Sequence, residues 1–408
     1  FLCLCLISIV EVFSAASTLT YKSGDHWGPI TQHSVILMVG AVVVVILHNI
    51  PYKWFQVFPV FLLPLSVVLL ALVMMMERIN GAARWMTFMG VQFQPSEVAK
   101  MAVIIVTAFI LSKGQDEDGA SPKAFKRIMI ITGVICLLIA PENLSTAALL
   151  FGVVYLMMFI GRVAMKKLLI LAGGLAGVAI IGVTFLVLTK NSDLPFLHRF
   201  DTWRARIEKF TNDNEVPAAK FDIDKDAQIA HARIAVATSH VVGKGPGNSV
   251  QRDFLSQAFS DFIFAIIIEE LGLIGGAFVV FLYVCLLIRV GRIAKKCERT
   301  FPAFLIIGIA LLLVSQAIFN MMVAVGLAPV TGQPLPLISK GGTSTLINCA
   351  YIGMILSVSR YTARLEEQKE HDALIPMQVE VPAEETNSDA QTAAEPTAKV
   401  LNSDAEFE

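Results

Sequence analysis

Long apolar runs separated by short polar stretches are the main feature of this sequence. Because a bilayer core takes about 20 apolar residues per helix, these runs predict ten membrane-spanning helices. Their ranges are 1–17, 33–50, 54–76, 97–112, 127–140, 143–160, 166–189, 261–288, 302–326 and 343–360. The fifth and sixth runs meet at Pro141–Asn143, which we interpret as a tight turn between two helices, with one broken helix as the alternative.

The first run admits a second interpretation. FLCLCLISIVEVFSAAS ends in small residues, as a secretory signal peptide does. Glu11 interrupts its apolar core and no basic residue precedes it, so we expect a span. The sequence begins at Phe1 and not at methionine, and we expect further residues before it.

Two regions fall outside the apolar runs. Residues 190–260 form a large loop before the eighth span, in which RFDTWRARIEKF has the spacing of an interfacial helix. Residues 366–408 are acidic and lack an apolar period, which predicts a disordered tail. The chain therefore divides into a transmembrane domain at 1–365 and a tail at 366–408.

The loop charges set the orientation in the membrane. One set of alternate loops holds 16 lysines and arginines, whereas the opposite short loops hold only Lys22, Arg78, Arg84 and Lys340. Cytoplasmic loops carry the excess of basic residues. Both termini are therefore predicted to be cytoplasmic, and the large loop extracytoplasmic.

The composition agrees with an all-α polytopic membrane protein. Of 408 residues, 55% are hydrophobic and 16% charged, against about 25% charged in soluble domains, and the mean hydropathy is +0.68. A net charge of −1 gives no case for nucleic-acid binding. The six cysteines and seven histidines show no disulfide or metal-ligand spacing, so no protein metal site is predicted.

Four polar clusters lie at the predicted extracytoplasmic ends of spans. The first is GAARWMTFMGVQFQPSEVAK at 81–100, where Pro95 suits a helix start and Glu97 and Lys100 form an i,i+3 pair. The alternative is an interface anchor followed by a helix cap. Its candidate substrate-binding residues are Arg84, Trp85, Gln94, Ser96, Glu97 and Lys100.

The second cluster is PENLSTA at 141–147, with Thr146 as the candidate and plain helix capping by Asn143 or Ser145 as the alternative. The third is SDFIFAIIIEELG at 260–272. Asp261 heads this run, either as a functional acid or as a helix cap. Exposing the carboxylate of Glu269 to lipid would cost free energy, so we expect it to face the bundle interior or a water-filled cavity.

The fourth cluster is GLAPVTGQPLPLISKGGTST at 326–345. Its prolines and glycines exclude a helix, and irregular backbone near a membrane is tolerated where it lines a cavity. Its amides are suited to an anion such as a phosphate, and a rigid structural turn is the alternative. Its candidate residues are Thr331, Pro334, Ser339, Lys340, Gly341 and Gly342.

Together the clusters offer carboxylates, cations and a rigid loop beside the lipid. This combination suits an amphiphilic substrate with a charged, sugar-like or phosphate head and a lipid tail. The residues alone do not fix a reaction.

The four clusters, in this order, resemble the SEDS family (shape, elongation, division and sporulation proteins), the peptidoglycan polymerases of bacteria. The similar stretches are GAARW…FQPSEVAK, PENLSTAALL, GKGPGNSVQRDFL…SDFIFAIIIEELG and NMMVAVGLAPVTGQPLPLISKGGTSTL. Within the family, GKGPGNSVQRDFL is more similar to the FtsW-like division branch, of the Bacteroidetes type, than to the elongation branch.

The resemblance implies ten transmembrane helices and a large loop before the eighth. It implies a glycosyltransferase of the bacterial inner membrane that polymerises lipid II at the septum, with Asp261 of DFIF as the catalytic base. It also implies partners, namely a class B penicillin-binding transpeptidase and other divisome membrane proteins. Gln228, Lys244 and Glu269 complete the expected substrate-binding set.

In this chemistry a sugar hydroxyl displaces undecaprenyl diphosphate with inversion. We expect Arg84, Lys100 and a divalent cation, Mg or Mn held mainly by the diphosphate, to neutralise the leaving group. Glu269 or Glu270 is expected to pair inside the bundle with a cation such as Lys100.

The chain departs from the family pattern at several positions. SQAFSD lacks the glutamate and histidine that often precede DFIF, SKGGTS places Lys340 where an aromatic is usual, and Ser145 replaces a glycine. Lys340 then either adds a diphosphate contact or is merely exposed. A lipid II flippase and a non-catalytic division scaffold are the competing functions; a flippase needs polar residues that reach both faces.

Overall fold

The structure is a computed structural model that describes residues 1–15, 28–75, 86–88, 91–116, 119–188, 226–255 and 259–374. Arg84, Trp85, the expected interfacial helix RFDTWRARIEKF and residues 375–408 lie outside the described residues. The chain divides into two units, Phe1–Ala363 and Arg364–Glu408.

Each of the ten predicted spans coincides with a helix. The helices are α1 (Leu2–Ala15), α3 (Gly28–Asn49), α4 (Phe58–Met74), α5 (Pro95–Lys113), α6 (Pro122–Ile139), α7 (Leu144–Ile160), α8 (Met165–Leu188), α11 (Ile263–Lys296), α12 (Thr300–Ala324) and α13 (Thr343–Leu374). Among the described helices, α3, α5, α8, α11 and α12 are long and apolar enough to cross a membrane. The protein is an all-helical, multi-pass membrane protein, as predicted, and α6 and α7 are separate helices.

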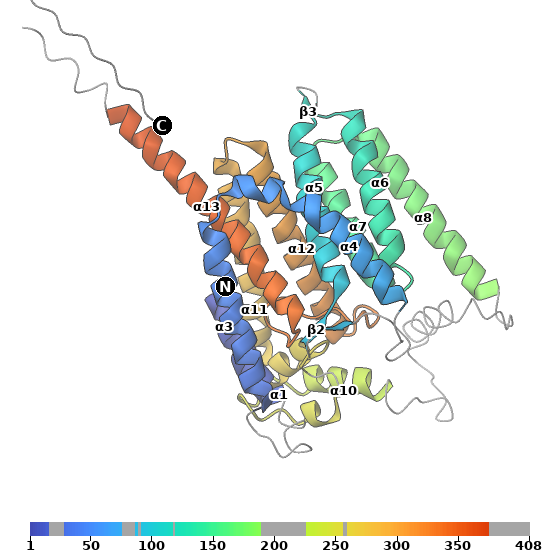
Figure 1. The fold of residues 1–408 in the computed structure, drawn as a ribbon. Helices are drawn as coiled ribbons and strands as arrows, with labels where there is room; N and C mark the ends of the chain where they lie inside the picture. Colours follow the sequence, from blue (N-terminus) through green and yellow to red (C-terminus); the bar gives the residue numbers. More distant parts are fainter. Residues whose placement is uncertain are drawn as a thin grey trace, which may run out of the picture. The chain divides into compact units, whose positions relative to one another are not determined.

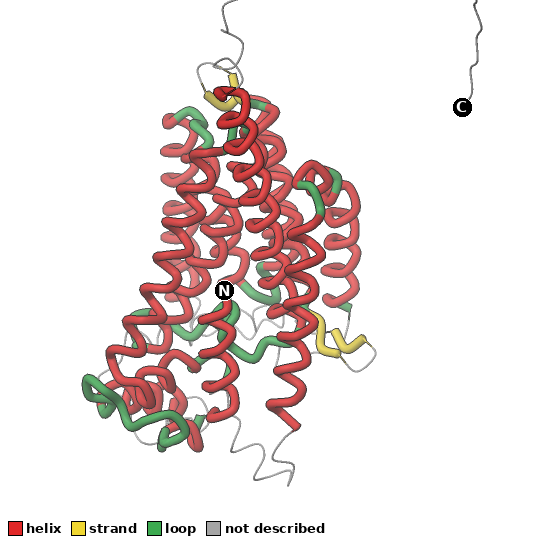
Figure 2. Tube along the Cα trace, turned by 90° about the vertical axis from the view of Figure 1, so that its left-hand side faces the viewer, coloured by secondary structure: helices red, strands yellow, loops and turns green. Residues whose placement is uncertain are grey.

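Short elements lie at the ends of the spans. They are η1 (Tyr52–Gln56), α10 (Asp226–Ala237), η4 (Gln251–Phe254) and two antiparallel hairpins, β1 (Met86–Phe88) with β2 (Val91–Phe93) and β3 (Gln115–Asp116) with β4 (Gly119–Ala120). The β1–β2 hairpin and α10 lie at one end of the helices and the β3–β4 hairpin at the other (Figures 1 and 2). This is the separation of ends that the alternating loops require.

Two helices form the centre of the bundle. The apolar windows of α5 and α12 are 72% and 67% buried, against 6% for α8. α12 packs against α5, α7 and α11, while α4 and α6 pack against α5. α1 packs against α3 and α11. Polar residues on α5 and α12 therefore lie inside the apolar core of the bundle.

A break in α11 is the main departure from the predicted spans. Gly272 has φ 72° and ψ −175°, so residues 263–271 form a short helical segment and a second helix follows. The amides of Leu273 and Ile274 donate to the carbonyls of His240 and Val241, each at 3.3 Å. Glu269 and Glu270 therefore lie at the end of a short segment and not within one long span.

The C-terminal helix also exceeds its prediction. α13 continues to Leu374, so residues 366–374, which we expected to be disordered, are helical. The sequence EEQKE at 366–370 consists of strong helix formers. The prediction, which used only the polar character of these residues, therefore placed the end of α13 too early.

Candidate active site

Asp261 lies two residues before the start of α11. The N-cap residue of α11 is Phe262, whose side chain makes no capping hydrogen bond. Asp261 is therefore not the N-cap residue of this helix, which argues against the capping alternative. Asp261 is half-buried, and its Oδ1 accepts a hydrogen bond of 3.0 Å from the Ser260 hydroxyl.

The α12–α13 loop, residues 325–342, holds the segment that carries Asp261. The Ser339 hydroxyl donates to the carbonyl of Ser260 at 2.7 Å and accepts from the amide of Leu335 at 2.8 Å. The amide of Lys340 donates to the carbonyl of Phe259 at 2.9 Å. Two successive carbonyls just before Asp261 are thus fixed by the loop.

Side chains from α12 and α7 complete the connection. Asn320 Nδ2 donates to the carbonyls of Asp261 and Gln333, at 3.0 and 2.8 Å. Gln333 Nε2 donates to Thr146 Oγ1 at 2.5 Å. The third and fourth clusters are therefore joined to the second through Asn320, which sequence reasoning did not single out.

The α12–α13 loop is itself rigidly held. Leu337 is buried and adopts φ 66°, a conformation that costs a non-glycine residue free energy and persists only where its surroundings hold it. The Tyr283 hydroxyl donates to the carbonyl of Pro336, and the Ser8 hydroxyl donates to that of Ile338 at 2.7 Å. The amides of this loop that we expected to receive an anion include those of Leu335 and Lys340, which are already bonded within the protein.

Lys100 is fully buried within the bundle. Its Nζ lies 2.8 Å from Glu97 Oε1 and donates to Gln316 Oε1 at 3.0 Å. Gln316 Nε2 in turn donates to the carbonyl of Pro334 at 3.1 Å. The predicted Glu97–Lys100 pair is confirmed. It ties α5 to the α12–α13 loop, so this geometry favours a positioning role for Lys100 over direct contact with a diphosphate.

Glu269 pairs with a cation, as we expected of one of the two glutamates, but that cation is Lys244 of a loop outside the bundle and not Lys100. Glu269 Oε1 lies 2.5 Å from Lys244 Nζ and also accepts from the amide of Val250 at 3.2 Å. Glu269 Oε2 accepts from the hydroxyl of Ser249 and from the amide of Gln251, the latter at 3.3 Å. A buried charge needs such partners, and the turn-rich loop supplies them.

Glu270 binds the same loop and also the end of α1. Its carboxylate accepts from the amides of Gly247 at 2.9 Å and Ser249 at 3.3 Å, and from the hydroxyl of Ser14. Arg252 Nη1 lies 3.7 Å from Glu270 and donates to Ser14 Oγ at 2.8 Å. We name residues 240–252 the clasp loop, because the two glutamates fix it to the segment that follows Asp261.

Lys340 is half-buried and faces an aromatic ring. Its Nζ lies 5.8 Å from the centroid of the Phe259 ring, a cation–π contact. Burial lowers the pKa of this ammonium below its ordinary value of 10.5. The alternative that Lys340 is merely exposed does not hold.

The lowered pKa of Lys340 predicts a pH-dependent stability. Between the folded-state pKa and 10.5, the unfolded chain binds more protons than the folded chain, so the stability of the fold rises with pH in that window. Lys340→Gln removes this contribution. We therefore expect the melting temperature of the wild type, relative to that of Lys340→Gln in the same detergent, to increase between pH 7 and pH 10. A difference in melting temperature that does not change with pH would contradict this cause.

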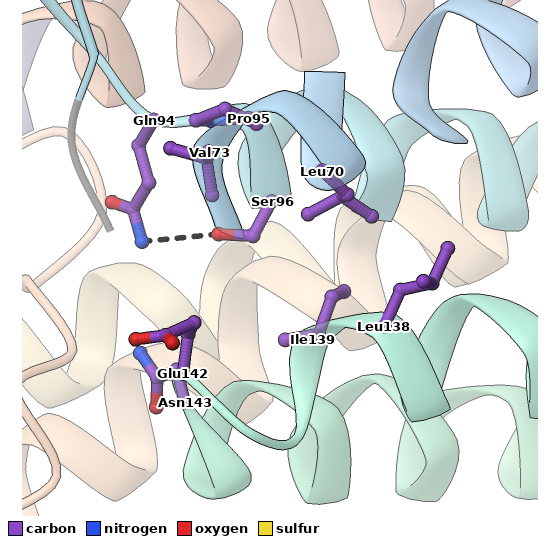
Figure 3. Close-up of a pocket in the computed structure, with 9 residues that line it drawn as sticks. All are labelled: Leu70, Val73, Gln94, Pro95, Ser96, Leu138, Ile139, Glu142 and Asn143. Atoms are coloured by element: carbon purple, nitrogen blue, oxygen red, sulfur yellow. Dashed lines mark hydrogen bonds between the residues drawn. The ribbon is translucent and has the colours of Figure 1, made fainter. Parts of the chain in front are cut away.

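A small hollow of about 20 Å³, with room for about one water molecule, opens where α4, α5, α6 and α7 meet. Its polar residues are Gln94, Ser96, Glu142 and Asn143, and Leu70, Val73 and Ile139 belong to its apolar part (Figure 3). Gln94 Nε2 donates to Ser96 Oγ at 3.0 Å. The first and second clusters therefore meet here.

The other predicted residues take different positions. Gln228 is half-buried on α10, and Lys244 forms an ion pair with Glu269. Thr331 is buried and Pro334 half-buried in the α12–α13 loop. The carbonyl of Gly341 accepts from Ser344, and Gly342 has φ 47° at the start of α13.

The residues that sequence reasoning missed are polar positions inside apolar helices. Gln316 and Asn320 are four apart on α12, and Ser8 and Ser14 lie on α1. Residues four apart share one face of a helix. Polar side chains at such spacing in an apolar span must find partners, and that signal would have indicated them.

Comparisons with known proteins identify the family of the chain. A family model described as "Cell cycle protein" (FtsW, RodA, SpoVE) matches residues 1–364. A relative from Halomonas elongata named "Probable peptidoglycan glycosyltransferase FtsW" is 32% identical over 378 residues, which cover 90% of this chain and 91% of that protein. A relative of the same name from Geobacter sp. (strain M18) is 32% identical over 359 residues, 86% of this chain and 92% of that protein.

Solved structures share the fold. A chain from the structure described as "Structural coordination of polymerization and crosslinking by a peptidoglycan synthase complex" has a TM-score of 0.67 at 24% identity, covering 89% of this chain and 98% of that chain. Rod shape determining protein RodA of Thermus thermophilus has a TM-score of 0.60 at 22% identity, covering 88% and 95%. With a RodA-like fold and a family match over nearly its whole membrane-spanning part, the chain belongs to the FtsW/RodA/SpoVE family of cell cycle proteins.

Proposed function

We propose that this protein is a peptidoglycan glycosyltransferase that polymerises lipid II, with Asp261 as the general base. The observation that carries the proposal is the position of Asp261. It is half-buried, it is not the N-cap residue of α11, and its backbone is fixed from α12 and the α12–α13 loop. A carboxylate held in this way is suited to remove a proton from a substrate hydroxyl.

The reaction follows from the chemistry of the substrate. The 4-hydroxyl of the acceptor GlcNAc attacks the anomeric carbon of the donor MurNAc, and its proton passes to Asp261. The bond from that carbon to undecaprenyl diphosphate breaks, and the α-linkage becomes a β-linkage by inversion. A hydrolase that inverts needs a second carboxyl group to protonate its leaving group, whereas diphosphate needs neutralisation of charge.

We propose that a divalent cation, Mg²⁺ or Mn²⁺, supplies this neutralisation and is held mainly by the diphosphate. Within the described residues, no three His, Cys, Asp or Glu side chains lie together as metal ligands. A cation that keeps several waters and binds substrate phosphates does not require such a cage. A further basic group of this chain is Lys340, which contacts Phe259, two residues before Asp261, through its amide and its ammonium.

The partner and location follow as further parts of the proposal. We infer a class B penicillin-binding transpeptidase as the partner, bound through α11 and α12, together with other divisome membrane proteins. The structural relative with a TM-score of 0.67 comes from a peptidoglycan synthase complex, and the named relatives are FtsW proteins. The protein then acts in the cytoplasmic membrane at the septum, with both termini in the cytoplasm.

The test is polymerisation of fluorescent lipid II by the purified protein with its cognate transpeptidase. Glycan strands made by the wild type, with the transpeptidase's active-site serine replaced, are the expected result. The same preparation in liposomes is tested for movement of lipid II across the bilayer. Movement without any polymer would overturn the proposal in favour of a flippase, and neither activity would favour a scaffold.

A further inference from the structure

Asn320 connects a central helix of the bundle to the segment that carries Asp261. It lies on α12, one turn before this helix ends at Ala324, and it is 1% exposed. Its Nδ2 donates to the carbonyl of Asp261 at 3.0 Å and to that of Gln333 at 2.8 Å. An amide nitrogen has two N–H donors, so both are used. One side chain on a buried helix therefore fixes the segment of Asp261 relative to the α12–α13 loop.

The carbonyl of Asp261 lies outside the helical hydrogen-bond pattern of α11. The amide of Ala265 donates to the carbonyl of Phe262 at 2.9 Å, one residue after Asp261. Phe262 has φ −111° and ψ 13°, so the helix does not continue back to Asp261. The bond from Asn320 thus gives this carbonyl a fixed direction that the helix does not supply.

The direction of this carbonyl affects the carboxylate. Both groups leave the same Cα, and the rotamers open to a side chain depend on the φ and ψ of its residue. The bonds from Ser339 and Lys340 fix the carbonyls of Ser260 and Phe259, which precede that Cα. The bond from Asn320 acts on the peptide that follows it, so it restricts ψ of Asp261.

We propose that Asn320 is a positioning residue for the general base. It fixes the peptide after Asp261 and so keeps the carboxylate within hydrogen-bond reach of the attacking hydroxyl, as a general base requires. Its nitrogen donates to backbone carbonyls of the protein, so it acts on the chemical step and not on the binding of substrate. This inference rests on the proposed function and deepens it.

Asn320→Leu removes both donors and keeps a side chain of similar size. We expect kcat for lipid II polymerisation to fall by about 10²-fold, the effect that a misplacement of about 1 Å can have on a reaction. KM is expected to stay within about twofold of the wild type. Initial rates over a range of lipid II concentrations, with the cognate transpeptidase whose active-site serine is replaced, separate the two constants.

Leu305→Ala is the matched control for lost stability. Leu305 is fully buried on the same helix, about 22 Å along its axis from Asn320. Its truncation leaves a cavity and lowers the melting temperature, but it changes no hydrogen bond at Asp261. We expect its kcat to stay within about twofold of the wild type at a temperature where both variants are folded.

Asn320→Ala is the second variant, because it removes the same two donors without the bulk of leucine. The same fall in kcat at unchanged KM is the expected result. Melting temperature in detergent and binding of the transpeptidase are measured for each variant, so that rates are compared between folded, partner-bound proteins.

The outcomes distinguish the two proposals. A folded Asn320→Leu or Asn320→Ala protein with the wild-type kcat would overturn the positioning role and leave the proposed function intact. A raised KM at unchanged kcat would do the same. An equal loss of kcat in Leu305→Ala would assign the effect to stability and would also overturn the positioning role. A wild type that makes no polymer would overturn the proposed function itself.

Discussion

Asp261→Asn is expected to lower the rate of glycan polymerisation by about 10²–10⁴-fold, the range that a general base contributes. Asparagine has nearly the same shape but cannot accept the proton of the attacking hydroxyl. The bonds that hold this segment use the backbone carbonyls of Ser260 and Asp261, so the substitution leaves them in place. The measurement is initial rate with fluorescent lipid II and the cognate transpeptidase, together with melting temperature and partner binding.

Asp253→Asn is the matched control for this experiment. Asp253 is 54% exposed in its side chain and contacts Arg252 at 3.5 Å, so the variant removes one negative charge without touching the residues around Asp261. We expect its rate to stay within about twofold of the wild type, since exposed pairs contribute little. A folded, partner-bound Asp261→Asn protein with the wild-type rate would refute the assignment of the base.

Much of the fold follows from the sequence because lipid imposes strong constraints. Apolar runs long enough to span a bilayer can satisfy their backbone groups only as helices or closed barrels, and each predicted run coincides with a helix. The turn between α6 and α7 was also predictable, since proline and asparagine interrupt the run. The family resemblance is confirmed by the match over residues 1–364, and the Bacteroidetes-type assignment stays a prediction.

The break in α11 was not predictable from hydrophobicity. Gly272 lies within a continuous apolar run, and one glycine in such a run is compatible with a helix. Its conformation is set by contacts with the clasp loop, whose residues Val241 and Gly243 lie about 30 positions earlier in the sequence. The partners of Glu269 and Glu270 were missed for the same reason, because tertiary contacts with Lys244 and Ser249 decide them.

The sequence predicted several residues of the candidate site, but it did not predict which hydrogen bonds and ion pairs they make. Thr146, Ser339 and Asp261 belong to one hydrogen-bonded network, as their common side of the membrane suggested. Lys100 was expected at the diphosphate but is buried against Glu97. An i,i+3 pair can be predicted from spacing, whereas its depth in the bundle depends on how α5 packs against α12.

Gly272→Ala is expected to destabilise the protein by about 3 kcal/mol or more. Its φ of 72° with ψ of −175° lies in a region that is nearly exclusive to glycine and costs an L-residue about 1–3 kcal/mol. A Cβ would also overlap the carbonyl of Val241 and the backbone of Gly243. Backbone atoms on both sides cannot move away without breaking the bonds from Lys244 and Gly245 amides to the carbonyls of Glu269 and Glu270.

Gly291→Ala is the matched control, since it adds the same methyl group within the second helical segment of α11. A Cβ at Gly291 meets no atom within 4 Å, and alanine in a helix is favoured over glycine by up to about 1 kcal/mol. The two variants are compared by unfolding in detergent. We expect a lower melting temperature for Gly272→Ala, an unchanged or higher one for Gly291→Ala, and reduced polymerisation only in the former, because the clasp loop positions the segment after Asp261. Equal stability of the two variants would contradict the close backbone contact between Gly243 and Gly272. It would also contradict the role of Glu269 and Glu270 in holding the clasp loop in place.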